Sequence, residues 1–265
     1  MVCATVGAMR RFLPVLVPLL CAVTACGGGT STLTSDYGAS IRAAVTKTTA
    51  QSSRMALTVT TKTAGQDISM TGDGLFGKVD GQAAGEFSVH VQSIAIEERI
   101  VGGSLYMQIP GQPGWYALKL KDLVGTSLET SASPASAAQV LLAVGKDVTK
   151  VGTDTVRGTT VTHYRGIINV EDAVKGSGYL GKAAAQKLKD QGVTSLPFDA
   201  YIDAQGQLRR LAEAITLTVQ GQPADVKTQV DFYDFGAPIT VVAPPVSEQK
   251  DGAPILAAIK NTLGG

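Results

Sequence analysis

The chain has 265 residues, a formal net charge of +1 and 17% charged residues. This balance argues against nucleic-acid binding, which needs a concentrated basic face, and beyond the first 26 residues no basic cluster is longer than Arg209–Arg210. Hydrophobic residues make up 44% of the chain, which is enough for a globular core. All three cysteines lie within the first 26 residues, so no disulfide can crosslink residues 27–265.

The N-terminus has the features of a signal peptide. Arg10 and Arg11 precede the segment 12–25, which is almost wholly apolar. A helix that spans the ~30 Å hydrocarbon core of a bilayer needs about 20 residues, so this segment is too short to cross it. A charged start, a short apolar run and small residues at its end are typical of a secretory leader. We therefore expect residues 1–25 to be a signal peptide.

The end of this leader, Val23-Thr24-Ala25-Cys26, resembles the bacterial lipobox. The resemblance implies that the Cys26 sulfur receives a diacylglyceryl group and that the leader is cut before it. The glycine-rich residues that follow predict a flexible tether over 26–34. Two acyl chains anchor a protein stably where one does not, so we expect a lipid anchor on the extracytoplasmic face of the cell membrane. The alternative is ordinary signal cleavage, with Cys26 as a bystander.

The first half of the remaining chain predicts one helix and then an antiparallel meander. Ser35 or Asp36 can cap a helix whose apolar face carries Ile41, Ala44 and Val45. From Met55 the apolar residues alternate with polar ones, which indicates strands. Further strands are predicted over 104–109 and 115–120. Turns are predicted at Gly65–Gln66, Gly72–Gly74, Asp80–Gly81, Gly102–Gly103 and Gly111.

The second half predicts helices alternating with strands. Ser133-Pro134 begins a helix that ends at Gly145, and a second helix over 179–191 follows a break at 176–178 and stops at Gly192. Strands are predicted over 149–170, with a turn near Arg157–Gly158, and over 198–203, 208–219 and 226–233, with a short terminal helix at 255–263. Asp203-Ala204-Gln205-Gly206 is a strong hairpin signal.

This order of elements favours an α+β fold in which helices gather on one face of an antiparallel sheet. The alternative is two small α+β halves. Because no linker rich in proline or serine divides the chain, we expect a single domain over residues 35–265.

Three stretches together resemble one family of bacterial proteins. They are VGTDTVRGTTVTHYRGIINV at 151–170, LPFDAYIDAQGQLRRL at 196–211 and DFYDFGAPITVVAPP at 231–245. With the lipobox, they resemble the LppX/LprAFG lipoproteins of mycobacteria and other actinobacteria, which are akin to the carriers LolA and LolB. The resemblance implies a strongly curved antiparallel sheet, a half-open barrel, with helices covering its concave face. It also implies an apolar cavity between sheet and helices that accepts acyl chains.

Alternating strands present one apolar face inward, and the low aromatic content of 5% leaves room in the interior. Methionine suits an adaptable apolar wall. An acyl chain would gain about 0.8 kcal/mol per buried CH₂ in such a cavity. The alternative is that the inward side chains fill a solid core. The residues expected to line the cavity are Leu57, Val59, Met70, Leu105, Met107, Ile109 and Leu217.

The sequence contains no pattern that predicts catalysis, a metal site or a cofactor. The two histidines, His90 and His163, lack a second ligand at metal-binding spacing, and a structural or surface role is expected for His163. We expect Asp231 and Asp234 to be surface-solvated rather than an acid–base pair. Trp115 is expected in the core or at its rim. For Arg209–Arg210, a solvated strand edge is favoured over a contact with a lipid head group.

These observations predict a membrane-anchored lipoprotein that binds an acylated lipid or glycolipid and carries or presents it within the cell envelope. Its expected partners are that lipid and, through Cys26, the membrane. The alternative is an envelope scaffold that transports nothing, or an accessory partner of a membrane exporter. A hydrolase of envelope lipids would need a nucleophile and a base within reach, and the scarcity of histidine argues against it.

Overall fold

The computed structural model describes residues 36–257, except 64, 66, 124–137, 177–181 and 220. The predicted signal peptide, Cys26 and the tether therefore lie outside the described residues. The same holds for the predicted start of a helix at Ser133-Pro134 and for residues 258–263 of the predicted terminal helix.

The observed order of helices and strands is close to the order predicted from the sequence. The first half contains α1 Tyr37–Thr49, β1 Ser53–Lys62, β2 Asp67–Val79, β3 Gln82–Val91, β4 Ile94–Val101, β5 Ser104–Gln108, β6 Trp115–Lys119, α2 Leu120–Leu123 and the 3₁₀ helix η1 Ala138–Ala143. The second contains β7 Val148–Val156, β8 Thr159–Asn169, α5 Val170–Gly176, α6 Lys182–Asp190, β9 Ser195–Asp203, β10 Leu208–Val219, β11 Gln222–Tyr233, the 3₁₀ helix η2 Val246–Glu248 and β12 Gln249–Asp251.

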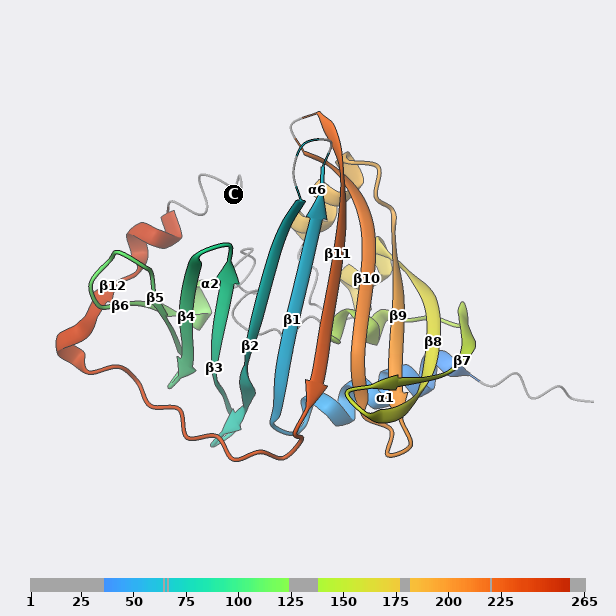
Figure 1. Ribbon diagram of the computed structural model, residues 1–265, viewed down its shortest axis with the longest axis horizontal. Helices are drawn as coiled ribbons and strands as arrows, with labels where there is room; N and C mark the ends of the chain where they lie inside the picture. Colours follow the sequence, from blue (N-terminus) through green and yellow to red (C-terminus); the bar gives the residue numbers. More distant parts are fainter. Residues whose placement is uncertain are drawn as a thin grey trace, which may run out of the picture. The chain divides into compact units, whose positions relative to one another are not determined.

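The strands form one curved sheet of 12 strands in the order β12-β6-β5-β4-β3-β2-β1-β11-β10-β9-β8-β7 (Figure 1). The pairing of β1 with β11 joins the first and second halves of the chain within this sheet. Neighbouring strands are antiparallel except at one edge, where β12 runs parallel to β6. The predicted α+β class and curved sheet are confirmed, while the parallel pair at the edge was not predicted.

The helices α1 and η1 contribute to a buried cluster on one face of the sheet, which we call the inner face. It carries Met55 and every second residue of β1 from there, together with their cross-strand partners. Ile41 and Val45 of α1 and Leu141 of η1 belong to the same buried cluster as Phe198 and Phe232 of the sheet. In the view of Figure 1, α1 and α6 lie behind the strands, so the opposite, outer face is toward the reader.

The predicted first helix is confirmed with its cap. Asp36 Oδ1 accepts a hydrogen bond from the backbone N–H of Ala39 at 2.9 Å, which satisfies one of the free donors of the first turn. Ile41, Ala44, Val45 and Thr48 are buried, so the apolar stripe read from the sequence is the face that contacts the sheet.

The predicted turn at Gly72–Gly74 is wrong, because both glycines lie within β2. Their inner-face positions are occupied by the ring of Phe87 from β3. A Cβ atom added at Gly72 would lie 2.7 Å from this ring, and one added at Gly74 would lie 2.6 Å from it. The glycines therefore continue the strand and make room for an aromatic ring, an arrangement known from glycines in other sheets.

The predicted turns at Asp80–Gly81, Gly102–Gly103 and Arg157–Gly158 are confirmed. Their residues have positive φ, for example 51° and 77° at Asp80 and Gly81, as tight hairpins require. In the described part of the predicted helix after Ser133, the chain is the 3₁₀ helix η1. The helix α6 ends before Gly192, whose φ of 79° stops it as predicted.

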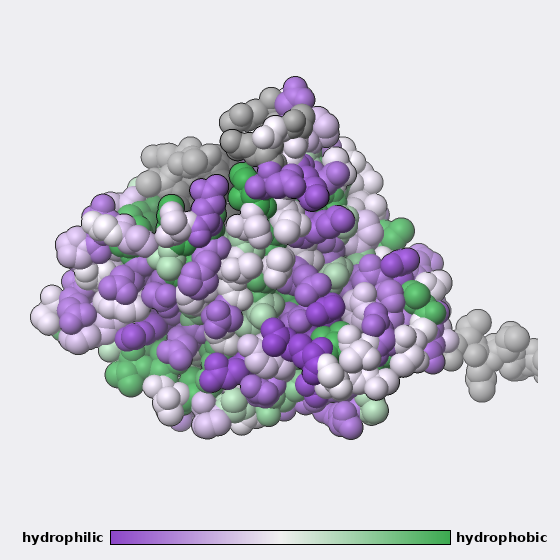
Figure 2. All heavy atoms as spheres, viewed as in Figure 1, coloured by the Kyte–Doolittle hydropathy of each residue, from purple (hydrophilic) through white to green (hydrophobic). Residues whose placement is uncertain are grey.

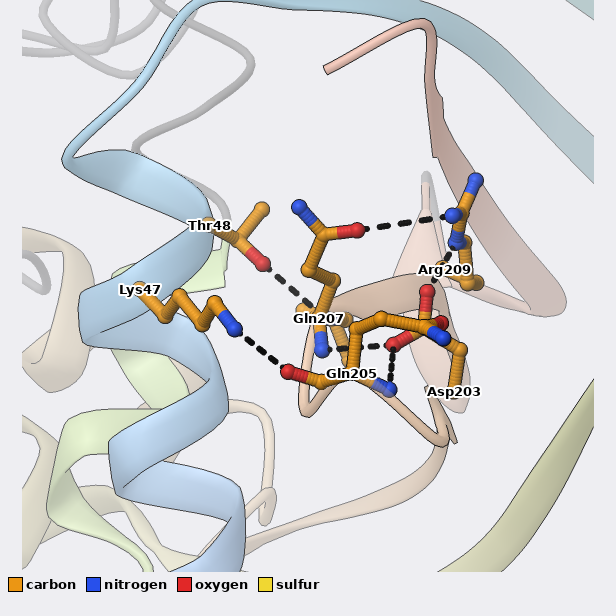
Figure 3. Close-up of polar contacts among 7 residues, drawn as sticks. Lys47, Thr48, Asp203, Gln205, Gln207 and Arg209 are labelled. Atoms are coloured by element: carbon orange, nitrogen blue, oxygen red, sulfur yellow. Dashed lines mark hydrogen bonds and ion pairs between the residues drawn. The ribbon is translucent and has the colours of Figure 1, made fainter. Parts of the chain in front are cut away.

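The predicted hairpin at Asp203–Gly206 is confirmed and is tied to α1 (Figure 3). Asp203 Oδ1 accepts hydrogen bonds from the N–H groups of Gln205 at 3.0 Å and Gln207 at 2.9 Å, while Oδ2 accepts from Arg209 Nε at 2.6 Å. From the helix, Thr48 Oγ1 accepts from the N–H of Leu208 at 2.9 Å, and this bond is buried. The hairpin thus fixes the C-terminal end of α1 against β10.

Candidate functional site

The inner face contains a closed row of side chains across six neighbouring strands. Register places Met107, Glu98, Phe87, Gly74, Met55 and Phe232 side by side, from β5 through β4, β3, β2 and β1 to β11. All six residues are buried, and Met55 is fully inaccessible. The side chains of this row are therefore almost completely shielded from solvent.

A second row, about four residues further along β1, differs in exposure. Register places Phe198, Glu213, Thr228, Val59, Met70 and Val91 side by side, from β9 through β10, β11, β1 and β2 to β3. Of these only Phe198 is buried, and the other five are partly exposed. We call this the open row.

Apolar side chains surround the open row on the inner face. Ile68 is 39% exposed and Ile94 is 50% exposed, although each belongs to a strand that has a neighbouring strand on both sides. A contiguous apolar surface that stays accessible in a folded protein is typical of a binding site. We define the open apolar area by the inner-face residues Leu57, Val59, Ile68, Met70, Val91, Ile94, Ile215 and Leu217.

The structure divides the residues predicted to line a cavity. Leu57, Val59 and Met70 are neighbours in the open apolar area, and Leu217 lies at its far side on β10. Leu105 and Met107 lie in the packed core instead, with exposures of 0% and 7%. Ile109 follows the end of β5, where its carbonyl accepts a hydrogen bond from Gln112 N at 3.0 Å. That the first four line a cavity stays a prediction.

Two carboxyl groups, those of Glu98 and Glu213, lie on the apolar inner face. Glu98 stands between Phe87 and Met107 and is 8% exposed, and Glu213 stands between Phe198 and Thr228. Within the described part of the chain, neither carboxyl group has a hydrogen bond or an ion pair, and neither has an unpaired oxygen that is wholly shielded from water. Burial raises the pKa of each to about 7, from an ordinary value of 4.5.

The sequence analysis missed both glutamates, although the pattern carried a signal. Ile96 and Ile100 lie two residues before and two residues after Glu98. Leu211 and Ile215 are placed in the same way around Glu213. Each glutamate thus occupies a position where the alternation of a half-buried strand calls for an apolar residue. A charged residue at an inward position of an alternating strand is the sequence signal that could have identified these two glutamates.

The outer face is lined by polar and small side chains, and hydrophilic residues predominate on it in Figure 2. A depression of about 390 Å³ is bordered by Thr58, Thr60, Ala212, Ala214 and Lys227. Another, of about 240 Å³, is bordered by Arg54, Asp73, Glu86, Arg99 and Trp115. Most of the side chains that border the two depressions are polar or charged.

A smaller pocket of about 220 Å³ lies between the end of α1 and the sheet. It is bordered by Thr48, Phe76, Ile100, Gln139 and Phe232. Ligand pockets typically measure ~300–1,000 Å³, so this one alone is too small for an acylated lipid.

The outer face also holds a network of ion pairs around Asp231. Arg210 donates hydrogen bonds of 2.6 and 2.8 Å to its two carboxylate oxygens, and Arg157 Nε lies 3.3 Å from Oδ2. The prediction that Asp231 is surface-solvated is wrong, because the residue is 5% exposed. Arg210, predicted at a solvated edge, is partly buried by this pairing, whereas the Asp234 side chain is 64% exposed.

The remaining candidates have structural roles. His163 stacks on the ring of Tyr201 at 4.4 Å, and its Nε2 lies 2.5 Å from Asp199 Oδ1. Trp115 is buried beneath the Arg99 guanidinium, which lies 4.5 Å from the ring centre. In the described residues no group of three metal-binding side chains is found, and no helix there is both long and apolar enough to cross a membrane.

Comparison with known proteins gives a fold and distant relatives. No family model matches the chain. The crystal structure of LprF from Mycobacterium bovis superposes with a TM-score of 0.51 at 13% identity, over 78% of this chain and 96% of that one. LppX from Mycobacterium tuberculosis gives a TM-score of 0.49 at 17% identity, over 77% and 97% of the two chains. The chain therefore shares the fold of LprF, which confirms the curved sheet expected from the sequence resemblance.

A sequence relative comes from Streptomyces griseus. It is an uncharacterized 31.2 kDa protein from the rplA-rplJ intergenic region, 26% identical over 197 residues. The match covers 69% of this chain and 63% of the relative, so the chain spans less than two thirds of that protein's length.

Proposed function

We propose that this protein is a membrane-anchored lipoprotein whose folded part binds an acylated lipid or glycolipid and carries or presents it within the cell envelope. The observation that carries this proposal is the open apolar area on the inner face of an LprF-like sheet. Each Å² of apolar surface removed from water contributes roughly 25 cal/mol, so lipid tails lying on this area would gain free energy.

The helices belong to the same proposal. They would cover the concave face above the open row, so that lipid tails are held between sheet and helices in an apolar cavity. The closed row would form the floor of this cavity, because its side chains leave no space of their own. Leu57, Val59, Met70 and Leu217 would then contact the tails.

Such a site suits exchange better than tight capture. Lipid tails would leave one apolar surrounding, the bilayer, for another of similar character, so the free energy of transfer is close to zero. Residues 1–25 would be removed as a signal peptide, and 26–34 would anchor the domain over 35–265 through the acylated Cys26. This arrangement would keep the binding domain next to the membrane on its extracytoplasmic face.

Native mass spectrometry of the full chain with Cys26→Ser, purified from an actinobacterial host, tests the proposal. The substitution removes the anchor, so any added mass of lipid size belongs to a bound ligand. We expect a co-purifying lipid in the chain that carries Cys26→Ser alone. The lipid should be lost when Val59→Lys is added, provided that this second variant remains folded. A chain that repeatedly carries no lipid and takes up no fluorescent lipid would favour the scaffold or exporter-partner alternative.

A further inference from the structure

Glu213 occupies a position on the inner face that folding alone does not explain. The nearest residues of β10 on the same face are Leu211 and Ile215, and the cross-strand partners of Glu213 are Phe198 and Thr228. Glu213 is partly exposed, and a carboxylate that loses part of its contact with water without gaining a partner costs free energy. In the described residues Glu213 has no such partner. Perturbed groups of this kind are concentrated at functional sites.

Its place in the open row distinguishes Glu213 from Glu98. Glu98 lies in the closed row between Phe87 and Met107, where the described side chains leave no room for a ligand. Glu213 lies in the open row, two strands from Val59, and so borders the open apolar area. A molecule covering that area would bring its own atoms to the carboxyl group.

The surroundings of Glu213 favour its neutral form. None of its inner-face neighbours on β9, β10 and β11 is titratable. The helix α1 also contacts β10, and its cations are engaged elsewhere: Arg42 donates to the carbonyl of Val144, and Lys47 donates to that of Gln205 at 2.5 Å. Burial therefore sets the pKa of Glu213 at about 7, without help from a nearby charge.

We propose that Glu213, as a neutral carboxylic acid, donates a hydrogen bond to an ester or amide carbonyl oxygen of the lipid whose tails cover the open apolar area. This inference rests on the proposed function and names the part of the ligand that the site recognises. A carbonyl near the start of an acyl chain fits, because it is an uncharged acceptor attached directly to apolar tails. An anionic group at the same place would be repelled by the carboxylate form.

The test compares two probes that differ only at the carbonyl. They are a fluorescent diacylglycerol and its dialkyl ether analogue, each added to the full chain with Cys26→Ser at pH 6 and pH 8.5. The ester probe should bind about 5- to 10-fold more tightly than the ether probe at pH 6, since one hydrogen bond contributes about 1 kcal/mol. This preference should shrink at pH 8.5, where the ionised carboxylate can no longer donate.

Variants assign the preference to one side chain. Glu213→Gln keeps an uncharged donor, so it should retain the ester preference at both pH values. Glu213→Leu should bind both probes equally while still binding their tails. Glu98→Gln is the matched control, because it removes the other inner-face carboxyl and should leave the preference and its pH dependence as in the unsubstituted chain.

The outcomes of this binding experiment separate the inference about Glu213 from the proposed function. Equal binding of both probes to the unsubstituted chain, or a preference that survives in Glu213→Leu, would overturn the inference and leave the proposed function intact. Ester binding that strengthens as the pH rises would also overturn it, in favour of a cationic ligand group paired with the carboxylate. If neither probe binds, the proposed function fails and the inference fails with it.

Discussion

Arg210 on β10 lies directly opposite Asp231 on β11 and donates hydrogen bonds of 2.6 and 2.8 Å to its two carboxylate oxygens. The pair is the centre of the outer-face network, because Arg157 reaches the same carboxylate. Hydrogen bonding to Asp231 raises the pKa of Arg210, so the guanidinium stays charged at every accessible pH. The pair therefore fixes the register of the two strands that carry Glu213 and Thr228.

Removal of this carboxylate should destabilise the fold. We expect Asp231→Asn to lower the free energy of unfolding by about 2 kcal/mol, because two arginines lose a charged acceptor that is largely shielded from water. Urea unfolding measures the change. The matched control is Asp234→Asn, three residues away, whose carboxylate is exposed and lies 3.8 Å from Arg54. That variant should change stability by less than about 0.5 kcal/mol. Equal effects in the two variants would contradict the assignment.

The inner-face carboxyl of Glu98 should make the stability depend on pH. Its pKa is about 7 in the folded chain and 4.5 when unfolded. Below pH 4.5 both states are protonated and the folded state has its full stability. As the pH rises toward 7, the unfolded state ionises first, and the folded state loses up to about 3 kcal/mol. Glu98→Gln should remove the contribution of Glu98 between pH 5 and pH 8 and leave that of Glu213, so urea unfolding should show a smaller loss of stability than in the unsubstituted chain.

The control for this experiment is Glu97→Gln, since Glu97 is exposed on the other face, where it accepts a hydrogen bond from Ser88 at 2.7 Å. Its variant should keep the pH dependence of the unsubstituted chain. The same stability difference between pH 5 and pH 8 in both variants would show that Glu98 does not titrate as described.

Lipid binding should depend on the inner face alone. Val59 and Thr60 are neighbours on β1, both partly exposed, and their side chains point to opposite faces. Val59→Lys places a charge among the lipid tails and should weaken binding of a fluorescent diacylglycerol at least about tenfold, or roughly 1.4 kcal/mol. Thr60→Lys places the same charge on the outer face and should leave the affinity unchanged. Comparable losses in both variants would exclude the inner face as the site.

The membrane anchor should depend on one cysteine. We expect the unsubstituted chain to incorporate a radiolabelled fatty acid and Cys26→Ser to incorporate none, because the thiol that carries the acyl chains is lost. Cys21→Ser, within the apolar leader, should behave as the unsubstituted chain does. Fatty-acid labelling that persists in Cys26→Ser would refute the lipobox assignment.

Local chemistry made much of the fold predictable. The hairpin at Asp203–Gly206 was visible because an aspartate side chain that binds its own turn and a glycine at positive φ are set by nearby residues. The cap of α1 at Asp36 has the same local origin. In contrast, Gly72 and Gly74 signal a turn in the sequence, and only the Phe87 ring packed against them from β3 explains their place within a strand. The parallel pairing of β12 with β6 is likewise set by distant residues.

The candidate site was only partly predictable for a related reason. Alternation identified Leu57, Val59 and Met70 as inward-facing, but it could not tell the open row from the closed row, since that depends on what covers each. The burial of Asp231 requires Arg210, and these residues meet only through the register of β10 and β11. Glu213 was overlooked because the pattern was read for its apolar members.

Photo-crosslinking tests the central claim most directly. The probe is a diacylglycerol with a diazirine on one acyl chain, irradiated with the full chain carrying Cys26→Ser, and the labelled residues are identified by peptide mass spectrometry. The account predicts labels on Leu57, Val59, Met70 and Leu217 that an excess of unlabelled lipid removes. Labels on the outer-face residues Thr58 and Thr60, or labelling that unlabelled lipid does not reduce, would contradict it.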